Sequence, residues 1–561
     1  MKFEQPSEKL IFSILLLSLG LRLFVSLYSN WIDIFFFDDA FYYFRIAQNF
    51  VSGLGLSYDG HQVTNGFQPL FLLIILPIFF FAGSNLILPL HLVAVFQSFV
   101  SLGTGIFLYK ISRIFLDKWF SLFIVAVWSF NPFIISQEMN GMETGLNLFL
   151  IAATSYYYLS RIAPSMESRN TKKLVFLGIL LSLTVLTRLD GILFLIAILT
   201  HTSYTIFKKY RGTPLTEKLQ VLFSTASPVI SLPLIVLMSW LIFNYKNTGS
   251  FMPVSGKAIR LISLNYGFGA CSFRDQFPLN DIPIRYYYEN ISYSLMKLLW
   301  HHPFTHSVSK FFSDLFHFSN MGNFQSFHFI SLFILGVFFI TVILFFLGSL
   351  RSLFSSMMFY FLYAFLLLCA FTFYIFGQWF YYRYYFPIYF LMTVCCGALF
   401  SLIYTNLEKM HKNFGTIFKG ILVTFYVLSS FLQIKGFIAL SQYGVNKQFH
   451  NIVKVIEKET PANAVVGCFQ SGVIGYYADR SIINLDGKVN EEALEAMKRG
   501  ELGRYVKKMG ITHVADWSFL LHALFFRNLG DYSEIKAIVP VYKGFFDIYR
   551  IKYKSAPSPP T

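Results

Sequence analysis

Charged residues are scarce in this 561-residue chain. Asp, Glu, Lys and Arg together make up 13% of the sequence, whereas hydrophobic residues make up 55% and aromatic residues 19%. With a mean hydropathy of +0.56, the chain is far more apolar than an average soluble protein. This composition excludes a soluble enzyme and indicates a protein that crosses a membrane many times and carries one modest soluble domain.

The sequence also lacks the motifs of several soluble enzyme classes. Its five cysteines form no CxxC or zinc-spaced pattern. No P-loop is present, and the glycines of the first hydrophilic loop are too irregularly spaced for a nucleotide fingerprint. The net charge of +16 does not indicate a nucleic-acid partner, because membrane proteins collect Lys and Arg in cytoplasmic loops and against anionic lipids.

Apolar runs dominate the first 436 residues. The run 10–27 has no cleavage site after it and predicts an uncleaved first span. Further runs lie at 68–83, 86–108, 119–137, 144–160, 174–187, 191–207, 220–243, 327–348, 356–376, 384–405 and 417–436. Because 68–83 is short and interrupted by Pro77 and Gly83, we interpret it as a re-entrant or interfacial helix, which leaves about eleven true spans.

Short basic loops predict the orientation of these spans. Neighbouring basic clusters are separated by an even number of predicted spans, as expected if all of them are cytoplasmic. The clusters are Lys110, Arg113 and Lys118; Arg161, Arg169, Lys172 and Lys173; Lys208, Lys209, Arg211 and Lys218; Arg351; and Lys409, Lys412 and Lys419. The other loops are then outside, namely 30–67, 138–143, 244–326, 377–383 and the chain after about 437.

Two adjacent carboxylates, Asp38 and Asp39, follow the first span. Side by side they repel one another and are costly to desolvate, so they persist where water, a metal or a substrate proton satisfies them. The plainer alternative is a solvated loop start, or an N-cap for a helix that begins near Phe41. We interpret the pair as catalytic residues or as ligands of a divalent metal.

Topology brings further polar side chains to the same outer face. They are Glu143 in QEMNGMETGL, Arg188 and Asp190 in LTRLDG, Lys257 in GSFMPVSGKAIR and Arg383 in GQWFYYRYYFP, with His61 as a secondary candidate close to the Asp pair in sequence. Carboxylates opposite cations at a lipid boundary suit an anionic head group carried on a lipid. The carboxylates take a proton or hold a metal, while the cations neutralise a phosphate leaving group.

Each of these residues also has a structural interpretation. Glu143 is equally suited to capping the helix that follows it. Arg188 and Asp190 suit an ion pair that closes a tight turn, which makes them second-tier candidates. Arg383 lies among tyrosines, where an arginine often snorkels to the membrane interface. Lys257 is as well explained by a solvated loop.

The remaining polar features carry less information. Arg22 lies inside the first span and needs a partner, so it is a functional candidate without an assigned role. The long loop 244–326 alternates aromatic and polar residues, which predicts amphipathic helices on the membrane surface. Its histidines, His301, His302 and His306, have no zinc-like spacing and are interpreted as incidental.

The chain after residue 437 has ordinary soluble patterning. The pattern predicts helices at 447–458 and 491–510 and strands at 464–468, 481–485, 511–516, 537–542 and 546–553. We therefore expect a small α/β domain over 437–553, followed by a disordered end at 554–561. Within it, Asp486 in NLDGKVN is interpreted as a turn residue.

Several of these segments resemble those of a known enzyme family. The segment DDAFYYFRIAQNFVSGLGLSYDGHQVTNGFQPL, followed by NGMETGL, TRLDG, GSFMPVSGKA and RYYFP, is similar to bacterial polytopic glycosyltransferases of the GT-C class. That class includes protein O-mannosyltransferases, the lipid A aminoarabinose transferase and mycobacterial arabinofuranosyltransferases. The tail segment FQSGVIGYYADRSIINLDGKVN resembles the outer domain of the same bacterial subgroup.

The resemblance implies a polyprenyl-phosphate sugar donor and an acidic residue in the first outer loop as general base or metal ligand. It also implies a second acidic site, here Glu143, and a core of seven spans before a long outer loop. The topology independently leaves seven spans before residue 244 once 68–83 is set aside.

We therefore expect a mostly α-helical glycosyltransferase with residues 1–436 in a bacterial inner membrane and 437–553 outside it. Asp38 or Asp39 would deprotonate an acceptor hydroxyl or hold a metal, with inversion at the sugar, while Lys257, Arg383 or Arg188 offsets the phosphate charge. Apart from that metal and the membrane lipids, no cofactor or partner beyond donor and acceptor is expected.

Two other classes of protein also place polar groups at a membrane surface. A transporter or flippase for a lipid-linked glycan would show internal repeats and charges deep in several spans, but the sequence has no repeat and its charges cluster at one face. A non-catalytic scaffold for envelope assembly would not need the Asp pair.

Overall fold

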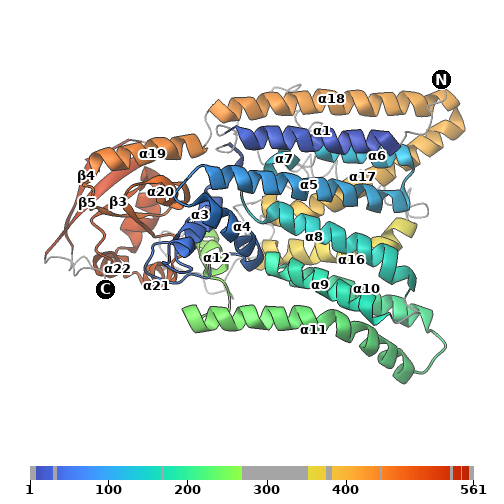
Figure 1. The fold of residues 1–561 in the computed structure, drawn as a ribbon, viewed down its shortest axis with the longest axis horizontal. Coiled ribbons are helices and arrows are strands. Elements are labelled where there is room, and N and C mark those ends of the chain that lie inside the picture. The colour runs from blue at the N-terminus through green and yellow to red at the C-terminus, as the bar shows by residue number, and fades with distance from the viewer. Residues whose placement is uncertain are drawn as a thin grey trace.

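The computed structural model describes residues 8–28, 34–165, 170–267, 351–374, 382–442, 445–530, 535–544 and 546–554. In this part of the chain, long helices form an elongated bundle with a small mixed sheet and its helices attached at one end (Figure 1). The predicted span 327–348 and the loop histidines lie outside the described residues.

The bundle is built from helices that, apart from the short α7, run roughly parallel or antiparallel to one another (Figure 1). They are α1 (Glu8–Leu27), α5 (Leu88–Phe115), α6 (Lys118–Phe130), α7 (Pro132–Glu138), α8 (Thr144–Tyr157), α9 (Thr171–Thr187), α10 (Gly191–Lys209), α11 (Leu215–Thr248), α16 (Arg351–Cys369), α17 (Tyr382–Met410) and α18 (Lys412–Gln442). Helices α8 and α16 each continue into a π-helical turn, Tyr158–Ile162 and Ala370–Tyr374.

Within the described residues, six helices are long and apolar enough to span a membrane, or seven if α6 and α7 count as one span. The predicted span 119–137 is wrong as a single helix, because α6 and α7 meet at a bend of 66°. Pro132 cannot continue the helical hydrogen bonding, and the Asn131 side chain instead accepts from Ile134 N and starts a new helix. Helices α8, α9 and α18 lie alongside the other spans (Figure 1).

Three shorter helices lie toward the sheet end of the bundle: α3 (Asp38–Val51), α4 (Pro69–Ala82) and α12 (Val254–Gly267) (Figure 1). Helix α4 is the short apolar run that was predicted not to cross. Its 14 residues rise by about 21 Å at 1.5 Å per residue, less than a hydrocarbon core of ~30 Å. This length favours the interfacial prediction for 68–83.

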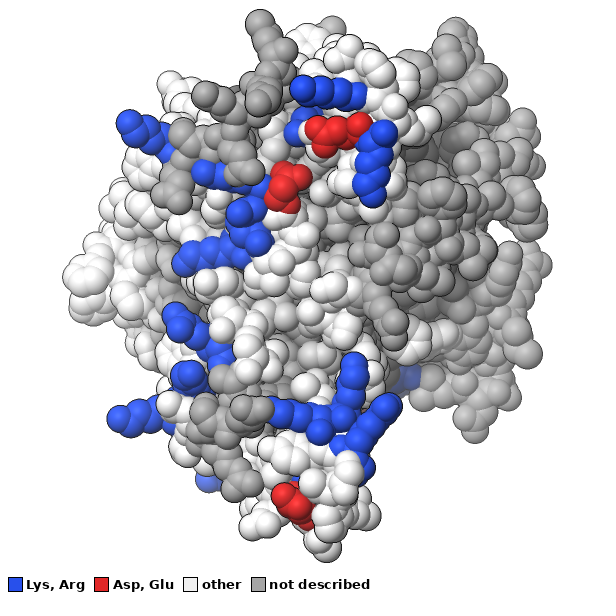
Figure 2. Space-filling view, turned by 90° about the vertical axis from the view of Figure 1, so that its right-hand side faces the viewer, with Lys and Arg blue, Asp and Glu red and all other residues white. Residues whose placement is uncertain are grey.

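The opposite end of the bundle is rich in Lys and Arg, and we call it the basic end. Figure 2 shows this face, where many basic side chains surround few acidic ones. Its cations lie in the end turns of bundle helices or in the loops between them, and include Lys110, Arg113, Lys172, Lys208, Lys209, Arg211, Lys409 and Lys412. The described basic clusters therefore share one end of the bundle, as the orientation prediction requires.

The C-terminal part forms a five-stranded mixed sheet with the order β2-β1-β3-β5-β4. Its elements are α19 (Val445–Glu459), β1 (Val465–Cys468), α20 (Gly472–Tyr477), β2 (Ser481–Asn484), α21 (Glu491–Arg499), α22 (Leu502–Lys508), β3 (His513–Trp517), α23 (Ser518–Leu520), β4 (Ile535–Tyr542) and β5 (Phe546–Tyr553). Strand β1 pairs in parallel with β2 and β3, whereas β5 is antiparallel to β3 and β4.

The predicted elements of this domain are all present, with one correction. The single helix expected over 491–510 is wrong, because Gly500 adopts a left-handed conformation (φ 64°) that ends α21 before α22 begins. Helix α20 was not predicted from its sequence GVIGYY.

The C-terminal domain packs closely on the first outer loop and α3. Tyr58 Oη donates to the carbonyl of Ser471 at 2.5 Å, and Tyr476 Oη donates to the carbonyl of Leu86 at 2.8 Å. The rings of Phe41 and Tyr476 lie 5.5 Å apart within a hydrophobic core shared by α3, α4, α19 and α20. The domain is therefore seated on the membrane part by apolar packing as well as by hydrogen bonds.

Arg22, the unassigned charge of the first span, has a structural partner inside the bundle. Its guanidinium Nη2 lies 2.8 Å from Glu138 Oε2, and both side chains are buried. Trp128 Nε1 donates to Glu138 Oε1 at 3.0 Å, and the Ser101 hydroxyl also donates to this carboxylate. Arg22 thus joins α1 to α7 rather than serving a reaction centre.

We predict that Arg22→Met destabilises the protein strongly, because it leaves the Glu138 carboxylate buried without its counter-charge. Breaking a buried pair on one side costs about 3–5 kcal/mol. The unfolding midpoint in detergent should fall markedly, and Arg22→Met with Glu138→Gln should recover much of the loss. Lys172→Met, at an exposed cation of α9, is the control; an equal midpoint for Arg22→Met and this control would contradict the assignment.

We also predict that Gly472→Ala loosens the C-terminal domain. A Cβ at Gly472 would overlap the carbonyl oxygen of Asp38, so α20 must shift away from α3, at a cost of about 1–3 kcal/mol for overpacking. Limited proteolysis should release the domain faster than from the parent protein. Gly544→Ala is a matched control, because its nearest neighbour lies 3.5 Å away; identical proteolysis rates for the two variants would refute the prediction.

Candidate active site

The two aspartates open α3 but do not cap it. The N-cap residue is Phe37 and no side chain caps the helix, so the capping interpretation is wrong. Acidic residues in the first turn of a helix are favoured by the positive end of its dipole. Rather than bonding to the backbone of α3, the two carboxylates point away from it, toward the C-terminal domain and α17.

Asp38 faces the C-terminal domain. Its Oδ1 accepts from Val473 N at 2.8 Å and its Oδ2 from Gly472 N at 3.4 Å, both at the start of α20. Burial raises the pKa of Asp38 to about 7, against the lowering effect of the Val473 hydrogen bond and with a further rise from the neighbouring Asp39 charge. Asp38 can therefore gain and lose a proton near neutral pH.

Asp39 lies between two cations. Its Oδ2 is 2.6 Å from Arg383 Nη2 on α17, and its Oδ1 is 3.2 Å from Lys488 Nζ in the C-terminal domain. Burial alone would raise the pKa of Asp39, but the charges of Lys488 and Arg383 outweigh it and hold the pKa well below its usual value. Asp39 is thus a fixed anion that joins three parts of the chain.

Lys488 is the residue of this cluster that the sequence reasoning missed. It follows Asp486 and Gly487 in a tight turn after β2, where Gly487 has φ 80° and Asp486 Oδ1 accepts from Lys488 N at 2.8 Å. Asp486 is a turn residue as expected, yet its Oδ2 also lies 3.2 Å from Lys488 Nζ and accepts from Tyr42 Oη at 3.3 Å. The only signal in the sequence was the Asp-Gly turn itself.

A second ion cluster is formed by Glu143, Arg188 and Asp190. The expected pair is present, with Arg188 Nη2 2.6 Å from Asp190 Oδ2. Arg188 Nη1 also reaches Glu143 Oε1 at 3.1 Å, and Tyr43 Oη donates to Glu143 Oε2 at 2.9 Å. Arg188 is therefore more than the closure of a turn, because it links the start of α10 to the start of α8.

Tyr384 connects the two clusters. The guanidinium carbons of Arg383 and Arg188 lie 5.1 and 5.0 Å from the centre of its ring. Arg383 is only 5% exposed and is paired with Asp39, so the snorkelling interpretation is wrong. The structure thus places Asp38, Asp39, Glu143, Arg188, Asp190 and Arg383 together at the domain end of the bundle.

Two predicted residues lie apart from this centre. Lys257 on α12 pairs with Glu491 at 3.0 Å, and its side chain is about a third exposed. His61 lies in an exposed turn, where its backbone N–H donates to Asp59 Oδ1. Their proposed roles in the site stay predictions.

The arrangement does not fit the divalent metal that the sequence suggested. The oxygens of Asp38 accept from two backbone amides, and those of Asp39 face two cations, so neither carboxylate is turned toward a shared ion. Across the described ranges, no three His, Cys, Asp or Glu side chains gather closely enough to hold one. We therefore derive no chemical step through a metal.

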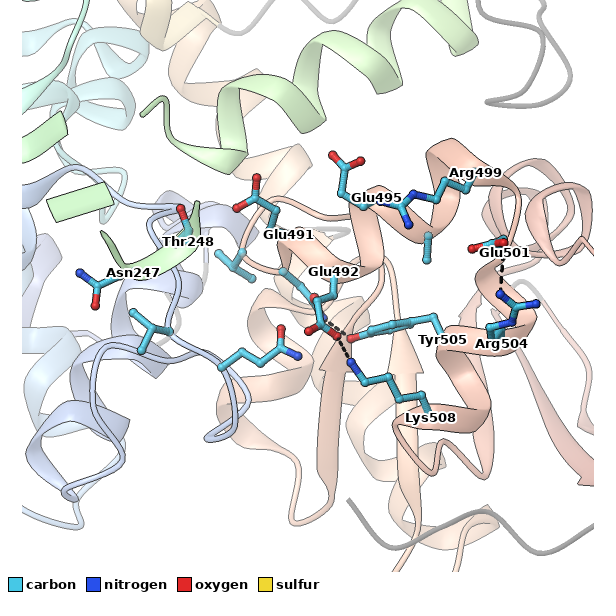
Figure 3. Close-up of a pocket in the computed structure, with 15 residues that line it drawn as sticks. Asn247, Thr248, Glu491, Glu492, Glu495, Arg499, Glu501, Arg504, Tyr505 and Lys508 are labelled. Carbon is cyan, nitrogen blue, oxygen red and sulfur yellow. Dashed lines mark hydrogen bonds and ion pairs between the residues drawn. The ribbon is translucent and has the colours of Figure 1, made fainter. Parts of the chain in front are cut away.

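A cleft of ≈ 610 Å³ opens beside the centre, between the membrane part and the C-terminal domain. In Figure 3, Asn247 and Thr248 lie on one side, and Glu492, Tyr505 and Lys508 on the other. Lys508 Nζ pairs with Glu492 Oε2 at 2.7 Å, so much of its charge is compensated. Because Val489 and Asn490 line the cleft, one wall continues directly from Lys488.

Two family models match parts of the sequence. Residues 69–240 match a family described as "Dolichyl-phosphate-mannose-protein mannosyltransferase". Residues 438–551 match a family described as "Domain of unknown function (DUF8728)". No curated protein matches the chain significantly.

Solved structures share the fold over nearly the whole chain. The oligosaccharyltransferase AglB from Archaeoglobus fulgidus, in complex with an inhibitory peptide and a dolichol-phosphate, has a TM-score of 0.57 at 13% identity, with 98% of this chain and 74% of that chain covered. A structure of the oligosaccharyltransferase from the same organism with Zn and sulfate has a TM-score of 0.53 at 15% identity, covering 97% and 73%.

ArnT from Cupriavidus metallidurans, bound to undecaprenyl phosphate, has a TM-score of 0.50 at 11% identity, and the match covers 95% of this chain and 97% of that chain. Identities this low show a common fold, and the family match over 69–240 adds a glycosyltransferase signature within it. The resemblance seen in the sequence is thereby confirmed: this multi-pass membrane protein shares the fold of these GT-C glycosyltransferases, and its residues 69–240 match a membrane glycosyltransferase family.

Proposed function

We propose that this protein transfers a sugar from a polyprenyl-phosphate carrier to an acceptor hydroxyl at the domain end of the bundle. The observation that carries the proposal is Asp39 held between Arg383 of the membrane part and Lys488 of the C-terminal domain, next to the buried Asp38, whose pKa is raised to about 7 by burial. A buried carboxylate pair among cations supplies both a base and a binding place for a phosphate.

The donor follows from the cations and from the matched structures. ArnT was solved with undecaprenyl phosphate and AglB with a dolichol-phosphate, and both share this fold. Arg383, Lys488 and Arg188 lie around Tyr384 and Asp39, and guanidinium groups bind phosphate through paired hydrogen bonds. Lys257 lies farther toward the cleft and suits an auxiliary role.

The transfer needs a base and a stabilised leaving group. The acceptor hydroxyl gives its proton to Asp38, and its oxygen attacks the anomeric carbon from the face opposite the phosphate. The bond between that carbon and the phosphate oxygen breaks, and the electron pair leaves with the phosphate, so the anomeric configuration inverts. Cations at the phosphate stabilise its growing charge, and no strong general acid is required.

Glu143 and Asp190 act through Arg188 in this scheme. Both carboxylates contact its guanidinium, and Tyr43 fixes Glu143 from the other side. This set holds Arg188 against Tyr384, where it faces the same ring as Arg383. Glu143 is therefore proposed to position a phosphate-binding arginine rather than to remove the acceptor proton.

The acceptor approaches through the cleft between Thr248 and Tyr505. The walls are polar and carry paired charges, which favours a hydrophilic acceptor segment over a bare hydrocarbon chain. The basic end marks the cytoplasmic side by the positive-inside rule, so the reaction takes place on the outer face, in a bacterium the periplasmic side of the inner membrane.

We predict that Asp38→Asn combined with Asp39→Asn abolishes release of polyprenyl phosphate from polyprenyl-phosphate sugars by the purified protein. Removal of the base lowers turnover by roughly 100-fold or more. Asp479→Asn, at an exposed carboxylate of the C-terminal domain, should keep full turnover. Undiminished turnover in the double variant would contradict a catalytic role for Asp38 and Asp39 and would favour the flippase alternative.

We also predict that turnover rises with pH through about 7. Asp38 acts as a base only when deprotonated, and burial raises its pKa to about 7, so the active fraction is half at that pH and nearly complete two pH units higher. A pH profile of kcat in the parent protein measures this. A profile flat from pH 5 to 9 would contradict Asp38 as the base.

A further inference from the structure

The Asp39 carboxylate occupies a place where two cations converge. A guanidinium nitrogen and an ammonium nitrogen each bind one of its oxygens, at 2.6 and 3.2 Å. Carboxylate and phosphate oxygens accept hydrogen bonds from such cations in the same way. The two cations come from parts of the chain far apart in sequence, so the site exists only when the C-terminal domain is docked.

The charges of this site are already balanced. Two cations, Arg383 and Lys488, face two carboxylates, Asp39 and Asp486. The side chains are 4 to 14% exposed, and charges so deeply buried are costly when uncompensated. A phosphate that enters without displacing a carboxylate would add at least one uncompensated negative charge.

From this geometry we propose that Asp39 is a built-in occupant of the donor-phosphate site, and that the donor phosphate displaces its carboxylate from both Arg383 and Lys488. The inference rests on the proposed function, because the displacing group is the phosphate of a polyprenyl-phosphate donor. It makes Lys488 a donor-binding residue supplied by the C-terminal domain.

Both cations have further partners that hold them in place when Asp39 leaves. Lys488 Nζ stays within 3.2 Å of Asp486 Oδ2. Arg383 Nη1 lies 3.2 Å from Met142 Sδ, and its guanidinium stays over the Tyr384 ring. Asp39 itself lies in the first turn of α3 with a side chain 14% exposed, so a change of rotamer suffices to move its carboxylate.

The exchange of Asp39 for the donor phosphate sets the order of donor binding and assembly of the reactive centre. Without a donor, the ion pairs of Asp39 tie α3, α17 and the C-terminal domain together. With a donor, the phosphate takes over the contacts to Arg383 and Lys488, so the domain stays docked. The Asp39 carboxylate, which has lost the two cations that hold its pKa low, takes up a proton as it turns away, so no uncompensated charge is left behind. Donor binding therefore precedes the assembly of the reactive centre.

Binding of farnesyl phosphate to the full-length protein in nanodiscs tests the exchange, with farnesol as the ligand that lacks the phosphate. Asp39→Asn removes the competing carboxylate, so farnesyl phosphate should bind about tenfold more tightly, which corresponds to about 1.4 kcal/mol. Lys488→Met removes a phosphate ligand, so binding should weaken by about tenfold. Lys498→Met, which breaks an ion pair with Glu495 on α21, should bind as the parent does.

The proposal predicts that the two variants change the affinity for farnesyl phosphate in opposite directions. If the ion pair between Asp39 and Lys488 were purely structural, both variants would loosen the domain and bind farnesyl phosphate more weakly. The combined variant should fall between the two, and farnesol binding should be equal in all of them. An affinity of Asp39→Asn equal to or below that of the parent would overturn the proposal, and so would an unchanged affinity of Lys488→Met. If Asp39→Asn does not fold, Asp39→Ser, which also removes the carboxylate, takes its place, with the same tighter binding expected and the same equal or weaker binding overturning the proposal.

Failure of the displacement proposal can be told apart from failure of the proposed transferase function. Sugar transfer by the parent protein without tighter phosphate binding in Asp39→Asn would overturn the displacement alone. Opposite shifts in phosphate binding without any sugar transfer by the parent would support the displacement and overturn the transferase proposal.

Discussion

The buried carboxylate of Asp39 is the constraint on which the rest of the centre depends. It is compensated from two sides, by Arg383 of α17 and by Lys488 of the C-terminal domain. Leaving such a group without its counter-charges costs several kcal/mol, so the membrane part and the soluble domain are joined by an electrostatic requirement. The hydrogen bond from the start of α20 to Asp38 and the close approach of Gly472 to α3 hold the C-terminal domain in position for the contact between Lys488 and Asp39.

Charge is divided along the molecule in a way that matches its two tasks. The basic end carries exposed cations, which suits contact with anionic lipid head groups. The domain end carries buried cations matched with carboxylates, which suits a reaction that moves a phosphate and a proton. The bundle between them holds Arg22 and Glu138 as a purely structural pair.

Sequence alone was sufficient for the membrane class, and it named most of the charged residues that meet at the domain end of the bundle. Asp38, Asp39, Arg188 and Arg383 stand next to apolar runs, and a charge in that position is costly enough to signal a function or a partner. The five strands of the C-terminal domain also followed from their sequence patterns, but their pairing did not. Asn131 and Pro132 contained the signal for the break between α6 and α7, although the apolar run concealed it.

Lys488 was beyond the reach of sequence reasoning, because its role arises only from tertiary docking. It is separated from Asp39 by 449 positions and lies in a polar turn of an ordinary soluble pattern. The roles of Glu143 and Lys257 were likewise undetermined, since capping, solvation and ligand binding all use the same residue types. The structure separates these roles: Glu143 contacts Arg188, whereas Lys257 contacts Glu491.

The central claim is that a lipid phosphate binds between Arg383 and Lys488 in place of the Asp39 carboxylate. An experimental structure of the full-length protein with a bound polyprenyl phosphate tests this most directly. The account predicts phosphate oxygens within hydrogen-bond distance of Arg383 and Lys488, with the Asp39 carboxylate turned away from both. A phosphate bound elsewhere, with Asp39 still paired to the two cations, would contradict it.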